Sequence, residues 1–413
     1  MSNVFEDITC AGCYCVCDDI QVTTDGQQII DVQTTCPQGQ AWFEQARQSE
    51  TLQPQIGKDA VSREDALARA AELLLNANAP LVFGMNQSAT DAQRAAVSLA
   101  DRLGATIDSG ATAATRALQQ VGEASCTLGE VRSRADLILY WDAEELRLNE
   151  KHRQSLAAGE PALSRKIVTL GTTTTAQSQD IDCAVTVPEE GEIDLIWRLR
   201  ALLKGIDLDG PEPTGLSIPE MQQLVSLIQQ SRYMVCFYGS SWKQGTLAHR
   251  KLEALSLLVR EIQAERRCHA LSVPAAGQTK GAEPVLAWQT GYAAAVNFAA
   301  GYPRFAPCES TTIRMLEKAE ADVCLLIGAD PLAGLAEAAL NHLKQIPLIQ
   351  VGSARLKDIQ PDVYLPAGIS GIHHAGSLYR FDGTPLPLRA LIAAPQLSEA
   401  EIIAQLENLL TTS

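Results

Sequence analysis

The chain has 413 residues and a formal net charge of −16, without a cluster of Lys or Arg. Nucleic acid and anionic membrane surfaces are therefore excluded as expected partners, because both require a concentrated basic face. No apolar run reaches the roughly 18–20 residues that span a bilayer, and the N-terminus lacks the pattern of a signal peptide. The length exceeds what one hydrophobic core usually serves, so two or three domains are expected.

Five of the eleven cysteines stand near the N-terminus. Four thiolates from two loops can hold a [4Fe–4S] cluster or one Zn²⁺. Zinc sites more often show two C-x2-C pairs, whereas three close cysteines and a distant fourth followed by proline favour iron–sulfur. Structural zinc, a disulfide and an empty vestige are the alternatives. The candidate metal ligands have the spacing C-x2-C-x3-C followed by a distant cysteine, and are Cys10, Cys13, Cys17 and Cys36.

The other cysteines are expected to be reduced thiols. Cys15 lies between two candidate ligands, and we predict that it is a small buried hydrophobe. Cys236 and Cys324 lie inside apolar runs and are expected in the core. This cysteine usage fits a reducing compartment, so a cytoplasmic protein is expected.

In chain order, the first feature is a predicted hairpin over 20–33, turned at Asp25-Gly26. Residues 1–55 therefore form a small β module with the cysteines on its loops. Beyond it, short apolar runs alternate with helical patterns, which predicts parallel sheets covered on both faces. Strands are expected at 80–84, 137–141, 167–171, 235–239, 323–328, 346–352 and 362–366, and helices at 66–75, 91–103, 193–203, 247–262, 334–343 and 398–410.

Ligands of such sheets bind where strand C-termini meet loops. Three loops qualify, although a glycine after a strand is often only a turn. Their candidate binding residues are Gly84, Asn86, Gly239, Gly328 and Asp330. The adjacent His373 and His374 are not expected to form a metal pair, because neighbours on an extended segment face opposite ways. The chain contains no phosphate-binding G-x-x-x-x-G-K, no H-E-x-x-H and no Ser–His–Asp arrangement.

Four segments carry a family resemblance, namely 10–19, 126–136, 288–305 and 376–383. With them the chain resembles the molybdopterin oxidoreductase family, and within it the B subunit of formylmethanofuran dehydrogenase and of the formyltransferase/hydrolase complex. The resemblance implies an α/β fold with two Rossmann-like parallel-sheet domains after the N-terminal β module, one inserted in the other, and no C-terminal β-barrel domain. The split domain is expected at 56–125 plus 276–413, and the inserted one at 126–275.

The resemblance also implies a molybdenum or tungsten ion held by two pterin dinucleotides, and this chain departs from that plan in three places. The segment 108–116, where relatives carry a Cys or selenocysteine ligand, has no soft ligand. The segment 142–145 places three carboxylates where a phosphate would bind, and we interpret it as a helix cap. The segment 273–281 lacks the family's arginine. The metal–pterin cofactor is therefore expected to be absent, and the glycine loops vestigial.

The resulting hypothesis is a non-redox scaffold, the B subunit of a formyltransferase/hydrolase complex in one-carbon metabolism and methylotrophy. In that family the partners are the A subunit, which is the hydrolase, the D subunit, which is the formyltransferase, and the C subunit. A retained [4Fe–4S] cluster would then be structural. The alternatives are a catalytic subunit of a tungsten or molybdenum formylmethanofuran or formate dehydrogenase, and an electron-carrying iron–sulfur protein without pterin.

Overall fold

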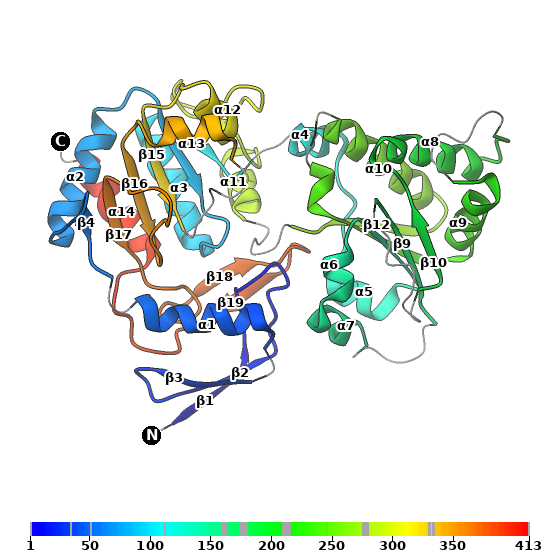
Figure 1. Ribbon diagram of the computed structural model, residues 1–413, viewed down its shortest axis with the longest axis horizontal. Helices are drawn as coiled ribbons and strands as arrows, with labels where there is room; N and C mark the ends of the chain where they lie inside the picture. Colours follow the sequence, from blue (N-terminus) through cyan, green and yellow to red (C-terminus); the bar gives the residue numbers. More distant parts are fainter. Residues whose placement is uncertain are drawn as a thin grey trace. The chain divides into compact units, whose positions relative to one another are not determined.

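The computed structural model describes residues 2–33, 35–49, 52–110, 113–157, 164–172, 181–208, 216–243, 245, 247–274, 281–328, 332 and 335–411. The chain forms two compact units (Figure 1), each with its own parallel sheet. Unit 1 is Met1–Ala111 with Ala276–Ser413, and unit 2 is Thr112–Ala275. The predicted α/β class with two parallel sheets is confirmed.

The N-terminal module is an antiparallel sheet of β1 (Asn3–Ile8), β2 (Ile20–Thr24) and β3 (Ile29–Gln33), followed by helix α1 (Pro37–Ser49). The predicted hairpin is confirmed, and Asp25 Oδ1 closes its turn by accepting the N–H groups of Gln27 and Gln28 at 2.8 and 2.7 Å.

The module has no core of its own. Its buried residues pack with those of the C-terminal region, including the hairpin β18 (Gly376–Tyr379) and β19 (Pro385–Leu388). The module therefore belongs to unit 1, and the C-terminal hairpin supplies apolar surface that a three-stranded sheet of this size lacks.

The large sheet of unit 1 has nine strands in the order β14-β13-β7-β6-β15-β16-β17-β4-β5. Its parallel centre joins strands from both ends of the chain, since β6 pairs with β15. The strands are β4 (Gln55–Ile56), β5 (Asp59–Ala60), β6 (Pro80–Gly84), β7 (Thr106–Asp108), β13 (Val296–Asn297), β14 (Arg304–Phe305), β15 (Val323–Ile327), β16 (Leu348–Gly352) and β17 (Val363–Pro366).

Helices cover both faces of this sheet because its central strands are apolar on both sides. Val82 faces a core shared with α2, α3 and α14, whereas Leu81 and Phe83 face a core shared with α12 and α13. The helices are α2 (Arg63–Leu75), α3 (Thr90–Leu103), α11 (Glu283–Thr290), α12 (Thr312–Glu317), α13 (Glu337–Leu343) and α14 (Glu399–Thr411).

Unit 2 is a five-stranded parallel sheet in the order β10-β9-β8-β11-β12. It starts at Thr112 rather than at 126, because α4 packs against α10. Its strands are β8 (Leu137–Trp141), β9 (Lys166–Gly171), β10 (Cys183–Thr186), β11 (Tyr233–Tyr238) and β12 (Arg267–Ser272). Its helices are α4 (Ala113–Val121), α5 (Leu128–Arg134), α6 (Glu144–Leu148), α7 (Glu150–Ala157), η1 (Glu189–Gly191), α8 (Glu192–Leu203), α9 (Ile218–Gln230), η2 (Ser240–Lys243) and α10 (Ala248–Gln263).

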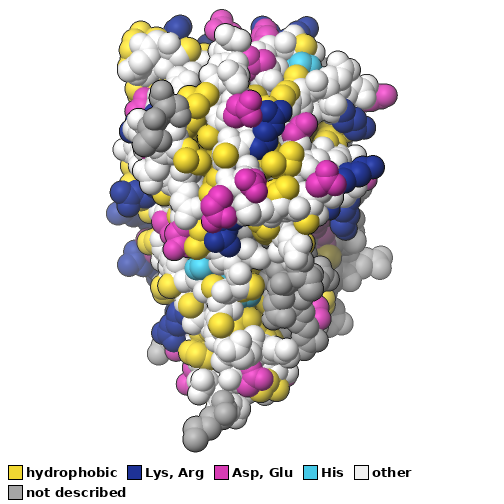
Figure 2. Space-filling view, turned by 90° about the vertical axis from the view of Figure 1, so that its left-hand side faces the viewer, with side chains coloured by type: hydrophobic (Ala, Val, Ile, Leu, Met, Phe, Trp, Pro, Cys, Tyr) yellow, Lys and Arg dark blue, Asp and Glu magenta, His cyan; other side chains and the backbone are white. Residues whose placement is uncertain are grey.

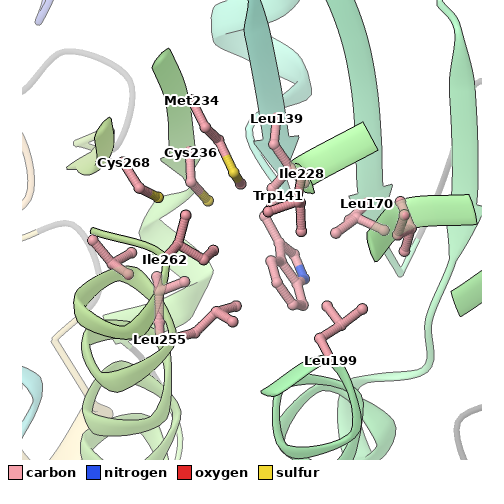
Figure 3. Close-up of a pocket in the computed structure, with 13 residues that line it drawn as sticks. Leu139, Trp141, Leu170, Leu199, Ile228, Met234, Cys236, Leu255, Ile262 and Cys268 are labelled. Atoms are coloured by element: carbon pink, nitrogen blue, oxygen red, sulfur yellow. The ribbon is translucent and has the colours of Figure 1, made fainter. Parts of the chain in front are cut away.

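The core of unit 2 contains one small cavity between the sheet and its helices (Figure 3). Trp141 and Leu170 from the strands face Leu199 and Leu255 from α8 and α10 across it. Its volume is about 10 Å³ and every lining residue is apolar or a cysteine, so it is a packing defect and not a ligand site.

None of the helices in the described part of the chain combines the length and hydropathy that crossing a bilayer requires. None of the eleven cysteines, all of which lie in the described part of the chain, is in a disulfide, and Cys236 and Cys324 are buried in the cores as predicted.

Candidate functional site

The candidate cysteine ligands come from two neighbouring segments of unit 1. Cys10, Cys13 and Cys17 lie on the loop between β1 and β2, and Cys36 directly precedes α1. The loop is closed by a hydrogen bond from Cys10 N–H to Cys17 O at 2.8 Å. Cys36 O accepts the N–H of Gln40 at 2.9 Å, so this cysteine marks the start of α1.

Two glycines allow the loop and the helix to approach each other. A Cβ on Gly12 would lie 3.0 Å from Trp42 Cβ and 3.0 Å from Gln38 O. A Cβ on Gly39 would collide with Thr35 Oγ1 and lie 3.1 Å from Cys10 Sγ. The glycines between and after the cysteines are therefore required by packing, because any side chain there would push the helix away from the sulfurs.

Cys13 lies among hydrogen-bond donors. The Cys15 thiol and the backbone N–H groups of Cys15 and Val16 hydrogen-bond to its sulfur and lower its pKa to about 7. Cys15 is buried as predicted, but it is also the thiol donor to Cys13, a role that the sequence analysis missed. Burial raises the pKa of Cys10 to about 12, and the neighbouring Cys13 and Cys36 contribute to the rise.

These features suit the donor chemistry of an iron–sulfur ligand set: thiols in two segments, of which Cys10 and Cys13 are buried, and N–H groups directed at Cys13. In the described part of the chain, no group of three or more His, Cys, Asp and Glu side chains is placed to hold a metal ion.

Three of the predicted binding residues meet at the strand ends of unit 1. Gly84 ends β6 and Gly328 follows β15, and a Cβ on Gly84 would collide with Ile327 O. Both glycines have positive φ, of 96° and 93°. A Cβ on Gly281 would lie 2.6 Å from Asn86 Oδ1, so only glycine leaves room for the Asn86 side chain there. Asp330 lies outside the described residues.

Side chains of unit 1 itself fill this edge. Gln93 Nε2 donates to Met85 O and Ser88 O, each at 3.0 Å, and these bonds hold the loop after β6. Glu399, at the start of α14, is buried beside Ser88. Burial raises the pKa of Glu399 to about 7, and the nearby Asp91 adds to this effect. In its ionised form, a buried acid at a strand end repels an anion such as a phosphate.

The corresponding edge of unit 2 is built around Asp142, which follows β8 with a φ of 46°. Its Oδ1 accepts the N–H of Thr172 at 3.0 Å, and its own N–H donates to Leu170 O at 2.8 Å. A Cβ on Gly171 would collide with Asp142 Oδ1, and a Cβ on Gly239 would collide with Asp142 O. The predicted ligand glycine Gly239 therefore makes room for Asp142.

Asp142 does not cap a helix, so that part of the interpretation of 142–145 was wrong. The N-cap of α6 is Ala143, which has no side-chain cap. Asp142 follows the end of β8, and its side chain instead accepts a hydrogen bond from the N–H of Thr172, the residue after β9. Glu144 pairs with Arg147 within α6, with Nε to Oε2 at 2.8 Å.

Glu192, at the start of α8, completes this edge. Its Oε2 lies 2.6 Å from Lys251 Nζ and its Oε1 accepts Trp141 Nε1–H at 3.1 Å. Burial and the adjacent Asp142 raise the pKa of Glu192 to about 7, against the lowering effect of Lys251. The ring of Trp242 packs against Trp141, with centroids 4.8 Å apart.

The chain's residues do not fit a metal–pterin cofactor. Asp108, at the end of β7, accepts the N–H groups of Ala295 and Thr312 at 3.1 and 2.8 Å, which anchors the segment where relatives place a soft ligand. The strand ends of both units carry buried carboxyl groups where a dinucleotide needs donors.

The adjacent histidines also serve packing. His373 Nδ1 accepts the N–H of Ile369 at 2.9 Å, whereas His374 Nε2 bonds to Gln396 O at 2.9 Å. The two rings therefore serve different neighbours, although residues 371–373 form a turn and not the extended segment that was expected.

Sequence analysis missed Glu192, Lys251 and Glu399. Each looks like an ordinary charged residue on an amphipathic helix, and two of them stand in the first turn, where an acid complements the helix dipole. Only the packing of the helix ends onto the strand ends buries them.

No family model matches the chain. It is 29% identical over 426 residues to the B subunit of the tungsten-containing formylmethanofuran dehydrogenase 2 of Methanocaldococcus jannaschii, covering 98% of each chain. It is 27% identical over 327 residues to the B subunit of the formyltransferase/hydrolase complex of Methylorubrum extorquens, covering 76% of this chain and 84% of that one. The chain is a homologue of these B subunits.

Solved structures agree in fold. The crystal structure of the Methylorubrum extorquens formyltransferase/hydrolase complex with methylofuran contains a chain that matches with a TM-score of 0.71 and 23% identity, over 87% of this chain and 99% of that chain. Acetylene hydratase from Pelobacter acetylenicus matches with a TM-score of 0.68 and 12% identity, over 98% of this chain and 69% of that one. The predicted resemblance is therefore confirmed.

Proposed function

We propose that this chain is the B subunit of a formyltransferase/hydrolase complex in one-carbon metabolism, and that it is a non-redox scaffold. One observation carries the proposal: the chain has the fold of a B subunit, but carboxyl side chains occupy the ends of its strands. They are Asp142 and Glu192 in unit 2 and Glu399 in unit 1. In their ionised form these groups repel the phosphates of a pterin dinucleotide.

The partners of the scaffold are the other subunits of the complex: the A subunit as hydrolase, the D subunit as formyltransferase, and the C subunit. The relative in Methylorubrum extorquens is named as a subunit of such a complex. With a net charge of −16, this chain is complementary to partners with basic faces. The eleven cysteines, none of them in a disulfide, favour assembly in the cytoplasm.

Cys10, Cys13, Cys17 and Cys36 would hold a [4Fe–4S] cluster that joins the β1–β2 loop to the start of α1. When bound, the cluster supplies four Fe–S bonds and a one-electron centre. In a scaffold the bonds matter, because a filled ligand set contributes to the free energy of folding.

A second function is favoured by one observation, the match over 98% of the chain to a tungsten-containing dehydrogenase subunit. In this alternative the chain is the catalytic subunit of a tungsten or molybdenum formylmethanofuran or formate dehydrogenase. It would require a metal ligand outside 108–116, because that segment contains neither Cys nor His.

Elemental analysis of the complex, purified without oxygen, tests the choice. We expect about four iron atoms per chain if one [4Fe–4S] cluster is bound, no stoichiometric tungsten or molybdenum, and no formate-dependent dye reduction. Tungsten or molybdenum near one per chain, with dye reduction that is lost when the cells are starved of that metal, would establish the catalytic alternative.

A further inference from the structure

A groove of about 280 Å³ lies beside β3 on the N-terminal module. One wall is the successive residues 28–32, and the other includes Gln40, Phe43 and Glu44 of α1 together with Ile392. Figure 2 shows hydrophobic side chains at the surface in its lowest part, the level at which Figure 1 places β1–β3. Gln40 is the one lining residue already described at the cysteine site, since its backbone N–H bonds Cys36 O, and its side chain has no part in that site as described above.

The groove follows the edge of a strand. Among the described strands, β3 pairs with β2 and with no strand on its other side. Side chains of a strand alternate between its two faces, so five successive lining residues mean that the groove runs along the backbone edge. Charged side chains and Pro commonly protect edge strands, and β3 contains no Pro and no Lys, with Asp31 as its charged residue.

The lining combines apolar and acidic groups. Ile30 is 55% exposed, and the buried Phe43 and Ile392 contribute apolar surface. Asp31 and Glu44 are the charged lining residues, and no Lys or Arg lines the groove in the described part of the chain. The surface therefore complements an extended segment with apolar and basic side chains.

We propose that the groove binds an extended segment of another subunit of the complex, which adds a strand to β3. The backbone of the segment bonds the free edge, an apolar side chain packs on Phe43 and Ile392, and a Lys or Arg faces Asp31 and Glu44. The acidic lining and the chain's charge of −16 disfavour a second copy as the occupant. This inference rests on the proposed function, since it identifies one contact of the proposed scaffold.

The test compares Ile30→Asp with Val4→Asp. Both residues are exposed, at 55% and 58%, and they lie on the two opposite edge strands of the same sheet. We expect Ile30→Asp to weaken binding to the other subunits at least about tenfold, because it replaces an exposed apolar side chain of the groove lining with a carboxylate that needs hydration. Val4→Asp should bind like wild type. Equal binding by both variants and wild type would overturn the proposal.

Hydrogen exchange of the unmodified chain gives a second measurement that does not depend on a variant folding. The amides of residues 28–33 should exchange more slowly in the complex than in the isolated chain, and those of β1 should not change. Unchanged exchange at 28–33 would contradict the strand addition.

A photo-crosslinking residue in place of Gln40 identifies the occupant. A crosslink to a Lys- or Arg-containing segment of another subunit is expected, and a crosslink to a second copy of this chain would overturn the inference. If the wild-type chain captures no other subunit, the proposed function fails as well. If the complex assembles and Ile30→Asp leaves it intact, only the groove is excluded.

Discussion

Lys251 and Glu192 form an ion pair inside unit 2, with 2.6 Å between Nζ and Oε2 and side chains that are 6% and 0% exposed. They come from α10 and α8, and Trp141 donates a further hydrogen bond to Glu192. A buried pair of this kind contributes little net stability, but removing one partner leaves an uncompensated charge. The pair therefore fixes the position of two helix ends at the strand edge.

Lys251→Met should destabilise unit 2 by about 3–5 kcal/mol, because Glu192 would stay buried without its cation. Urea unfolding monitored by tryptophan fluorescence measures the change, since Trp141 and Trp242 both lie at this site. The double variant Lys251→Met/Glu192→Met should recover most of the loss, and a double variant no more stable than the single one would contradict this explanation.

The matched control is Lys204→Met. Lys204 also pairs with a glutamate, Glu261, at 2.9 Å, but its side chain is 54% exposed. Loss of an exposed pair should cost no more than about 1 kcal/mol.

Glu399 gives the stability of unit 1 a pH dependence. Its folded-state pKa is raised from 4.5 to about 7, so the folded state holds the proton more tightly than the unfolded state. Its contribution to stability is therefore fully present below pH 4.5 and is lost as the pH rises through 7. Glu399→Gln should make the unfolding free energy less dependent on pH between about 5 and 8, by up to about 3 kcal/mol.

Glu401, two residues further along α14, provides the opposite control. It accepts the Ser398 N–H at 2.8 Å, and this bond lowers its pKa. Its contribution is present at neutral pH and lost on acidification, so Glu401→Gln should reduce stability more at about pH 7 than at about pH 3. Denaturant titrations at several pH values measure both slopes, and slopes of the same sign would refute the assignment.

Gly171 and Gly239 test how Asp142 fills the edge of unit 2. Gly171→Ala should destabilise by about 1–3 kcal/mol, because the new Cβ meets the Asp142 side chain. Asp142→Gly should relieve that clash and retain the positive φ. The same change should not rescue Gly239→Ala, whose Cβ meets the Asp142 backbone oxygen. Thermal unfolding of the single and double variants checks this, and equal rescue of both would be inconsistent with the geometry.

The sequence was sufficient to predict most of the parallel strands and several of the helices that alternate with them, because these depend on local apolar patterns. Val82 and its neighbours Leu81 and Phe83 show why, since a strand buried on both faces is a continuous apolar run. The strands β7, β10 and β12 and the helix α9 were not predicted. The cysteine spacing likewise indicated a cysteine-bearing loop before β2, but the helix α1 directly after Cys36 was not predicted, since a β module alone was expected there.

The buried carboxyl groups could not be predicted, because their burial depends on tertiary packing. Glu192 and Lys251 are far apart in sequence and meet only when α8 and α10 pack on one sheet. Asp142 was expected to oppose an anion, which stays a prediction, and its bond to Thr172 N–H depends on the register of β8 and β9. The role of Cys15 as a donor to Cys13 requires a backbone turn that spacing alone does not specify.

Cys13→Ser tests whether the proposed cluster is structural. If it is, iron content and thermal stability should fall together, with a drop in Tm of about 5 °C or more, because the loop loses its bond to the start of α1. Cys308→Ser is the control, since Cys308 is exposed and lies far from the motif in sequence, and it should change neither quantity. Iron analysis and calorimetry on protein purified without oxygen measure both, and lost iron with unchanged Tm would point to electron transfer instead.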